Sequence, residues 1–111
     1  MDSPKIIFAP RAKLQIAKTA RYIKDELGLP KAAKNLLDAI EDKASILTVF
    51  PNAYPVDEKA SYLSGREIRT ISMKAHRLLY RFDAKRNEAH ILSLRFGSEN
   101  PDSLLEGDLK D

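Results

Sequence analysis

The sequence contains no cysteine among its 111 residues, which excludes disulfide bonds, thiolate zinc sites and a cysteine nucleophile. Imidazole is scarce as well, because His76 and His90 are the only histidines. No uninterrupted apolar stretch approaches the roughly 18 residues that suggest a membrane span, and the N-terminus lacks the long apolar segment of a signal peptide. We therefore expect a cytoplasmic protein with no metal, no cofactor and no membrane partner.

Glycine and proline are few, at four and six residues, while 43% of the residues are hydrophobic and 32% are charged. This balance is typical of a folded globular protein rather than a disordered or fibrous one. The length is close to that of a common single domain. We expect one domain over residues 1–111 that ends in an acidic tail at about 99–111.

The net charge of +3 conceals an uneven distribution. Residues 66–95 hold only three acids but eight cations, namely Arg66, Arg69, Lys74, Arg77, Arg81, Lys85, Arg86 and Arg95. Residues 96–111 hold five acids and a single lysine. A basic block of this kind attracts phosphates or an acidic protein surface, or it is only a solvated face, and both interpretations stay open.

The N-terminal half predicts a strand and two helices. Residues 5–8 form a short apolar run. Apolar positions then recur every three or four residues over 11–27 and again over 31–49, which indicates two amphipathic helices. Because only Gly28, Leu29 and Pro30 separate them, the helices should form an antiparallel hairpin that packs on one sheet.

The C-terminal half changes to a pattern of short strands. Residues 51–65 show no sustained periodicity and are predicted to be a loop. The segments 66–71, 76–83 and 88–96 are rich in β-prone residues and are separated by turn-sized gaps, so they predict an antiparallel meander. Asn100 is placed to cap one further short helix. The predicted class is α+β, with both helices on one face of a small sheet and its other face uncovered.

Three stretches of the sequence resemble one known family. They are ARYIKDELGLPKAAKNLLDAIEDKASILTVFP at 20–51, GREIRTISMKAHRLLYRF at 65–82 and HILSLRFGSENP at 90–101. In this order they resemble the RelE/ParE superfamily of toxins from type II toxin–antitoxin systems. The resemblance covers Lys5 to about Pro101 and implies a toxin that stops growth until a cognate antitoxin binds it.

The resemblance implies two possible targets. RelE-like members of the family cut messenger RNA on the ribosome, whereas ParE-like members inhibit DNA gyrase. The long helical hairpin resembles the ParE-like branch. Many members carry a histidine or a basic residue beside the glycine that corresponds to Gly97, but here Phe96 and Ser98 flank it. We therefore expect a plasmid- or chromosome-stabilising toxin that binds gyrase, with two alternatives: a metal-independent, ribosome-dependent endoribonuclease, or an inactive toxin that only binds its antitoxin.

Cleavage of RNA by its own 2′-hydroxyl requires a proton acceptor, a proton donor and cations that stabilise the charged phosphate. The catalytic candidates for a nuclease are Arg77, Arg81, Arg95, His76 and Tyr80. Arginine binds phosphate well but shuttles protons poorly. Tyr80 shares the strand parity of apolar neighbours, which favours a core position. For each of the two histidines, a strand-edge residue with no role is the favoured interpretation.

The candidate target-binding residues are Arg66, Arg69, Arg77, Arg81 and Arg95. Arg77 and Arg81 share one face of their predicted strand, and Arg69 and Arg95 join them only if the strands align in a suitable register, which the sequence does not fix. The alternative is that the arginines point into solvent and pair with Glu67, Asp83 or Glu88.

The expected partner is an acidic, partly disordered antitoxin that folds as it wraps apolar grooves beside the hairpin, covers the basic sheet and forms a hetero-oligomer with the toxin. For the acidic tail, a solubilising terminus is the favoured interpretation. The alternative is that the tail shields the basic face of its own chain.

Overall fold

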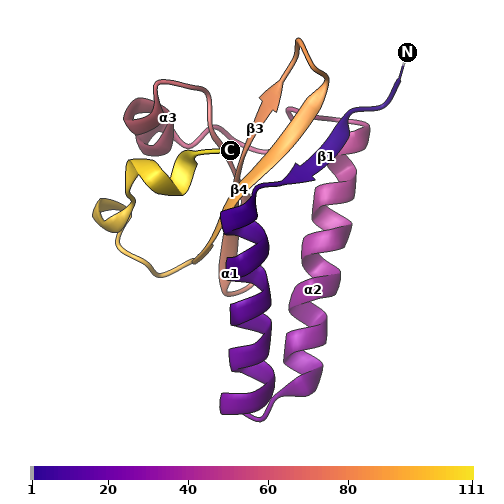
Figure 1. Ribbon diagram of the computed structural model, residues 1–111, viewed down its shortest axis with the longest axis vertical. Coiled ribbons are helices and arrows are strands. Elements are labelled where there is room, and N and C mark those ends of the chain that lie inside the picture. The colour runs from indigo at the N-terminus through magenta and orange to yellow at the C-terminus, as the bar shows by residue number, and fades with distance from the viewer. Residues whose placement is uncertain (1) are drawn as a thin grey trace.

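The computed structural model describes residues 2–111 and contains a four-stranded sheet in the order β1-β4-β3-β2 (Figure 1). β2 (Arg69–Ser72), β3 (His76–Asp83) and β4 (Glu88–Phe96) form the predicted antiparallel meander. β1 (Lys5–Phe8) pairs in parallel with β4 at one edge. The α+β class and the meander are therefore confirmed, although β2 begins at Arg69 rather than at residue 66.

The helical hairpin is also confirmed. α1 (Pro10–Arg21) continues into a π-helical turn (Tyr22–Glu26), and α2 (Pro30–Ser45) ends in a 3-10 turn (Ile46–Thr48). Each α-helix has a proline at its first position, where no backbone N–H is required. Figure 1 shows the far end of the hairpin extending beyond the sheet. Within residues 2–111, no helix has both the length and the apolar character needed to cross a membrane.

The main core lies between the hairpin and one face of the sheet, which we call the hairpin face. Its buried residues are Ala12, Leu36, Ile40, Leu47, Ile71, Leu78, Tyr80, Ala89, Ile91 and Leu94. Alternation along β3 places Leu78, Tyr80 and Phe82 on this side, as predicted. The register with β4 shifts between Leu79 and Tyr80, where a β-bulge interrupts the ladder.

The segment predicted to be a loop contains a helix, so that prediction was wrong for its second half. α3 (Glu58–Ser64) begins after Asp57, whose side chain accepts a hydrogen bond from the backbone N–H of Ala60 at 3.0 Å. It ends at Gly65, which adopts the left-handed conformation with φ of +72°. These two caps stabilise a helix that has only seven residues and buries only Ala60.

The second face of the sheet is covered, which corrects the prediction that it is uncovered. α3 and the C-terminal residues 99–111 pack on it (Figure 1), and we call it the tail face. A second apolar cluster forms there from Ala60, Ile68, Leu79, Leu92, Leu104 and Leu109. Leu104 follows the 3-10 turn Pro101–Ser103, and Leu109 ends the 3-10 turn Glu106–Leu109. Asn100 caps the first turn, as predicted. The tail is therefore part of the folded structure, and its interpretation as a merely solubilising terminus was wrong.

Candidate functional site

Three of the predicted site arginines lie on the tail face. Arg77 in β3 stands directly opposite Arg95 in β4, and Arg81 stands opposite His90. Arg66, in the segment between α3 and β2, reaches the same tail that covers these strands. The meander therefore brings together the cations that the sequence predicted to share a surface.

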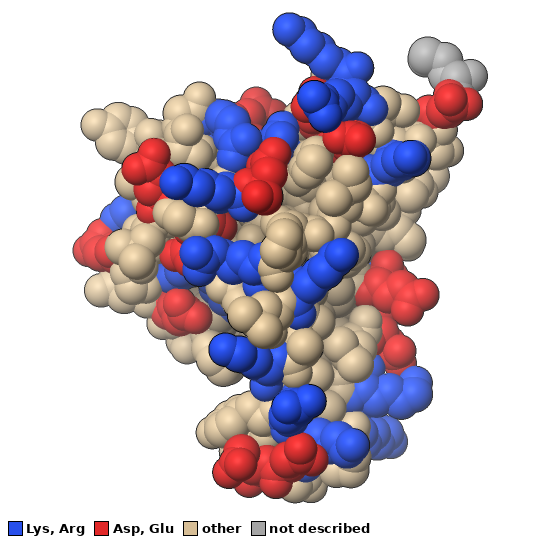
Figure 2. Space-filling model, in the orientation of Figure 1, with Lys and Arg blue, Asp and Glu red and all other residues tan. Residues whose placement is uncertain are grey.

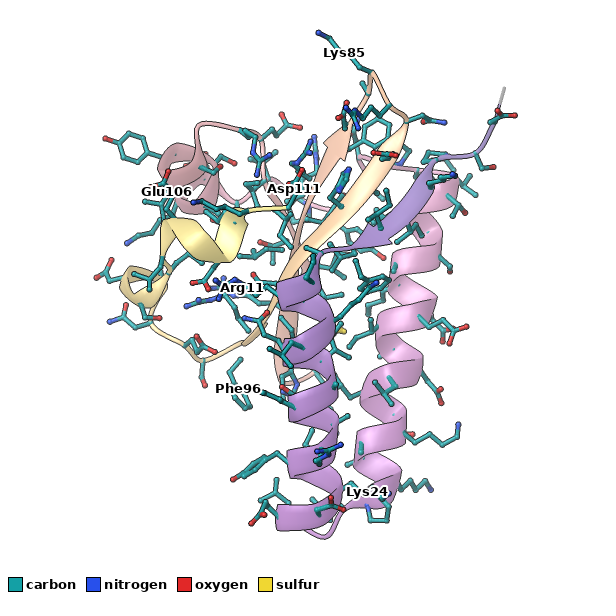
Figure 3. All side chains as sticks on the ribbon, in the orientation of Figure 1. Arg11, Lys24, Lys85, Phe96, Glu106 and Asp111 are labelled. Carbon is teal, nitrogen blue, oxygen red and sulfur yellow. The ribbon has the colours of Figure 1, made fainter. Side chains whose placement is uncertain are left out.

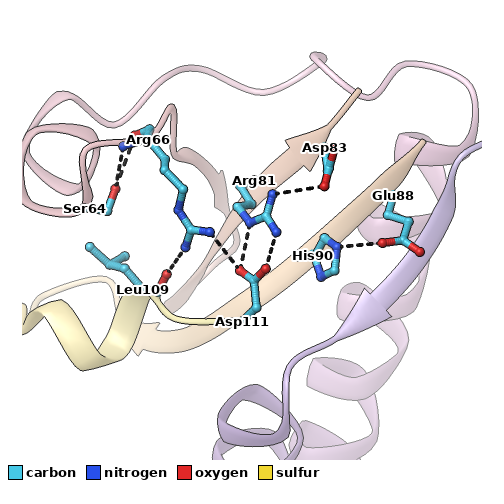
Figure 4. Close-up of polar contacts among 8 residues, drawn as sticks. All are labelled: Ser64, Arg66, Arg81, Asp83, Glu88, His90, Leu109 and Asp111. Carbon is cyan, nitrogen blue, oxygen red and sulfur yellow. Dashed lines mark hydrogen bonds and ion pairs between the residues drawn. The ribbon is translucent and has the colours of Figure 1, made fainter. Parts of the chain in front are cut away.

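Asp111 pairs with two of these arginines at once (Figure 4). Nε of Arg81 donates to its Oδ1 at 2.8 Å, and the Arg81 Nη2 contacts its Oδ2. Nη1 of Arg66 lies 3.3 Å from the same carboxylate, while Nη2 of Arg66 donates to the backbone oxygen of Leu109. The hydrogen bond from Arg81 is the main cause that lowers the pKa of Asp111 to about 2, and it raises the pKa of Arg81.

Arg95 is enclosed by the tail and is only 6% exposed. Its Nη2 donates to the hydroxyl of Ser103 at 2.7 Å and lies 3.0 Å from a carboxylate oxygen of Glu99. Its Nη1 lies 3.6 Å from Asp108, which also faces Arg11 at 3.4 Å. Figure 3 shows Arg11 at the start of α1. Arg95 therefore connects the tail to β4 rather than facing solvent.

Arg77 faces the N-terminus of α3. Its Nη1 lies 3.8 Å from Oδ2 of Asp57, the residue that caps that helix. The hydroxyl of Thr70 in β2 donates to the same Oδ2 at 3.0 Å. One carboxylate thus caps α3, binds β2 and partly neutralises Arg77.

The arginine surface is therefore assembled, but the chain's own acids occupy it. Figure 2 shows lysine and arginine interspersed with aspartate and glutamate where α3 and the tail lie, rather than a uniformly basic patch. Of the acids expected to pair with the arginines, Asp83 lies 3.8 Å from Arg81 and Glu67 lies 2.9 Å from Arg69. Asp57 was not predicted. The contacts of Asp108 and Asp111 agree with the less favoured interpretation of the tail, in which it shields the basic face of its own chain. The signal for that interpretation was the acid surplus of 99–111 set against the basic surplus of 66–95.

Arg69 lies on the hairpin face, so it does not join the other arginines. It pairs with Tyr80 in the register of β2 and β3, and residues paired directly across a ladder share a face. Its guanidinium donates to the backbone oxygens of Asn52 and Tyr54 and to the carboxylate of Glu67 at 2.9 Å. These contacts fasten the segment before α3 to the sheet.

The candidate proton shuttles Tyr80 and His76 are separated from the tail-face arginines. Tyr80 is fully buried on the hairpin face, and its hydroxyl donates to the backbone oxygen of Pro51 at 2.9 Å. Burial raises the pKa of Tyr80 and lowers the pKa of His76. His76 shares the parity of Tyr80 on β3 and packs its ring 4.8 Å from that of Phe96. Neither side chain can exchange a proton beside the tail-face arginines.

His90 is the histidine on the tail face. It stands opposite Arg81, and its Nε2 lies 3.1 Å from Glu88 (Figure 4). Among residues 2–111, no three histidine, aspartate or glutamate side chains cluster so as to hold a metal ion.

An apolar groove of about 650 Å³ lies between α1 and α2 beside β1. Its lining includes Ile6, Phe8, Ile16, Ala17, Leu37 and Ala44. β1 pairs with β4 on one side only, so its outer edge adjoins the groove as an open edge of the sheet. An apolar groove beside an open edge suits a partner segment that is partly helical and partly extended.

Comparison with known proteins agrees with this architecture. The model of a family described as the ParE toxin of the type II toxin–antitoxin system parDE matches residues 6–101. Among solved structures, the toxin–antitoxin complex RelBE2 from Mycobacterium tuberculosis contains a similar chain. That chain shares 19% sequence identity, the similarity covers 89% of this chain and 97% of the other, and the TM-score is 0.58. No curated protein matches the sequence.

Proposed function

Since the chain belongs to the ParE toxin family of type II toxin–antitoxin systems, we propose that it stops growth by binding DNA gyrase in the cytoplasm. The observation that carries this proposal is the separation of Tyr80 and His76 from the arginines of the tail face. A nuclease needs a proton acceptor and a proton donor beside its phosphate-binding cations. A gyrase inhibitor needs a binding surface and no proton shuttle.

On this proposal, Arg66, Arg77 and Arg81 are the residues that contact the target. They retain side-chain exposures of 39%, 20% and 15%. Their partners Asp111, Asp57 and Asp83 are partly exposed carboxylates, so an acidic partner surface can compete with them for the arginines. Arg95 and Arg69 contribute by holding the tail and the segment before α3 in place.

The RelBE2 structure is that of a toxin–antitoxin complex, which supports a cognate antitoxin as the second partner. We assign to it the groove between α1 and α2, where Leu37 is 43% exposed. A helical segment there buries this apolar surface, and an acidic extension of the same chain then neutralises the cations of the tail face. The complex would be a toxin–antitoxin hetero-oligomer.

Ribosome-dependent cleavage of messenger RNA is the alternative, and one observation favours it. His90 lies opposite Arg81 on the tail face and contacts Glu88 at 3.1 Å, so a proton acceptor does lie beside one cation. The pair Arg81 and His90 would then be catalytic residues.

Two assays on the purified toxin separate these functions: inhibition of DNA supercoiling by gyrase, and cleavage of messenger RNA on ribosomes. We expect the wild type to inhibit supercoiling, Tyr80→Phe to retain that inhibition, and Arg81→Ala to weaken it about tenfold, as loss of a charged contact at an interface does. Lys85→Ala, which removes an exposed cation at the β3–β4 turn (Figure 3), is the matched control.

Messenger RNA cleavage that is lost in His90→Ala or Arg81→Ala would overturn the gyrase proposal. A wild-type chain that binds its antitoxin but shows neither activity would identify an inactive toxin. Circular dichroism of each variant separates a lost contact from a lost fold.

A further inference from the structure

The net positive charge of the protein is concentrated near its N-terminus rather than in the block 66–95. Residues 3–24 hold six cations and no acid, whereas the rest of the chain holds three more acids than cations. Acids of the tail pair with arginines of the block. The cations of residues 3–24 are Lys5, Arg11, Lys13, Lys18, Arg21 and Lys24. Four of these six belong to α1, which contains no acid.

Part of this charge points away from the groove assigned to the antitoxin. Successive residues of an α-helix are rotated by roughly 100°. Lys13 and Ala17 therefore lie on one side of the buried Ala12, and they line the groove. Lys18 and Tyr22 lie on the other side, and they line a separate depression. A partner segment in the groove leaves this second side of α1 accessible.

The depression beside Lys18 has aromatic walls. Its volume is about 360 Å³, and it is lined by Lys18, Thr19, Tyr22 and Phe96. Tyr22 and Phe96 are 49% and 47% exposed, and Figure 3 shows Phe96 beside α1. The ring of Phe96 packs 4.8 Å from that of His76, which supports it from the protein side. We call Lys18, Arg21, Tyr22 and Phe96 the α1 surface.

Cations outnumber acids around the α1 surface. The lining of the depression contains no acid, and neither does that of its neighbour, which shares Tyr22 and Phe96 and adds Lys74. Where α1 runs in Figure 1, Figure 2 shows lysine and arginine side chains, with acids at the far end of the hairpin.

Three acids adjoin the α1 surface along the chain. Asp25 and Glu26 belong to the π-helical turn after α1, and they offset two of the four cations Lys18, Arg21, Lys24 and Lys74. The carboxylate of Glu99 accepts a hydrogen bond from the backbone N–H of Phe96 and lies 3.0 Å from Arg95, so it is already paired. The charge beside the two rings therefore stays positive.

We propose that the α1 surface binds single-stranded nucleic acid. Phosphates contact Lys18 and Arg21, and a base stacks on the exposed rings of Tyr22 and Phe96. Exposed aromatic rings beside cations bind single strands in this way, because every base offers a π-face. Arg11 and Arg21 lie roughly 15 Å apart along the helix axis, so the basic side of α1 is long enough to follow several phosphates.

The two rings favour a single strand over other anionic partners. An acidic protein segment pairs with the cations but offers no flat group to each half-exposed ring. A duplex offers phosphates, but its bases are stacked on one another and their faces are not available. Nucleic-acid binding here goes beyond gyrase inhibition, and it is measured without gyrase.

A fluorescein-labelled oligothymidylate, titrated with the full chain and followed by fluorescence anisotropy, tests the proposal. We expect saturable binding that weakens with salt. Three phosphate contacts predict a slope of about −2 when the logarithm of affinity is plotted against that of salt concentration.

A pair of lysine variants locates the phosphate contacts. Lys18→Gln should weaken binding about threefold to tenfold and make the salt slope shallower by about 0.7, the contribution of one phosphate. Lys85→Gln removes the same charge at the β3–β4 turn (Figure 3) and should change neither quantity. Glu26→Gln removes one of the two offsetting acids and should strengthen binding about twofold.

A second pair of variants tests stacking. Tyr22→Leu keeps an apolar side chain but removes the ring, and it should weaken binding about tenfold without changing the salt slope. Tyr22→Phe keeps the ring and should bind as the wild type does. Tyr22 is half exposed, and circular dichroism of each variant confirms that the fold is retained.

Three outcomes would overturn the proposal. The first is the absence of saturable binding, or an equal loss in Lys18→Gln and Lys85→Gln. The second is a duplex of the same length that binds as tightly as the single strand, with no effect of Tyr22→Leu. The third is a polyglutamate peptide that displaces the oligonucleotide at an equal concentration of charge, which would identify an acidic protein as the occupant.

Discussion

Replacing Asp111 with asparagine tests whether the tail is held on the sheet by its charge. The substitution keeps the size of the side chain but removes the negative charge that Arg81 and Arg66 share. Both guanidinium groups lose their shortest ionic contact. The tail keeps its apolar contacts through Leu104 and Leu109, so the fold should persist with lower stability.

The pKa of Asp111 gives the size of the effect. Its pKa is about 2 in the folded chain against an ordinary value of 3.8, and this difference corresponds to roughly 2.5 kcal/mol at full strength. The side chain is 35% exposed, so solvent screens much of the interaction and we expect a loss of about 1 kcal/mol in the free energy of unfolding at pH 7.

The sign of the pH dependence follows from the same values. Folding depresses the pKa of Asp111, so its contribution to stability is complete above pH 3.8 and is lost as the pH falls through about 2. Wild type and Asp111→Asn should therefore differ in stability at pH 7 and converge near pH 2.

Urea denaturation followed by far-UV circular dichroism, repeated between pH 7 and pH 2, measures this difference. Glu106→Gln is the matched control, because Glu106 is an exposed tail acid that forms no ion pair within the described chain (Figure 3). The reasoning is refuted if Asp111→Asn is no less stable than this control at pH 7, or if their difference is undiminished at pH 2.

Two further predictions concern the cover of the tail face. Asp57→Ala should lower the free energy of unfolding by about 1–2 kcal/mol, because α3 loses its N-cap and Arg77 loses its carboxylate; Asp57→Asn keeps the capping acceptor and should lose less in the same urea titration. Leu109→Ala should cost about 2–4 kcal/mol, because Leu109 is 1% exposed in the second apolar cluster. Leu105→Ala, at a position that is 67% exposed, is the control and should change the free energy of unfolding by less than about 0.5 kcal/mol. Equal losses of stability in Leu105→Ala and Leu109→Ala would contradict the burial of Leu109.

Local patterns were sufficient to predict β3 and β4. The predicted boundaries, 76–83 and 88–96, are those of the structure, because alternating side chains and a turn-forming AKRN segment are properties of adjacent residues. The helical hairpin was predictable for the same reason, since a stripe of apolar residues repeats over several turns of each helix.

Hydrophobic periodicity did not predict α3, because a helix of seven residues spans only two turns and buries only Ala60. The usable signals were its ends: Asp57 is a preferred N-cap residue and Gly65 is a preferred residue just beyond a helix. Capping residues are therefore better evidence than hydrophobic spacing for helices as short as this one.

The sequence was sufficient to predict which arginines share a face at the candidate site, but not which acids pair with them. The parity of β3 placed Arg77 and Arg81 on one face, as the structure shows. Their actual partners depend on how neighbouring strands align and on the path of the tail, and sequence spacing fixes neither. The pairing of Arg81 with Asp111 is such a long-range contact.

The parallel pairing of β1 with β4 also sets the order in which the toxin can fold during synthesis. Lys5 lies beside Glu88, so the first strand to leave the ribosome waits for the last strand before it gains a partner. Until then the apolar stripes of α1 and α2 have no complete sheet to cover, and closure of such a long loop is slow. A nascent chain that stops short of β4 therefore lacks both its main core and its arginine face, and the complete toxin fold forms only when translation of the domain is nearly finished.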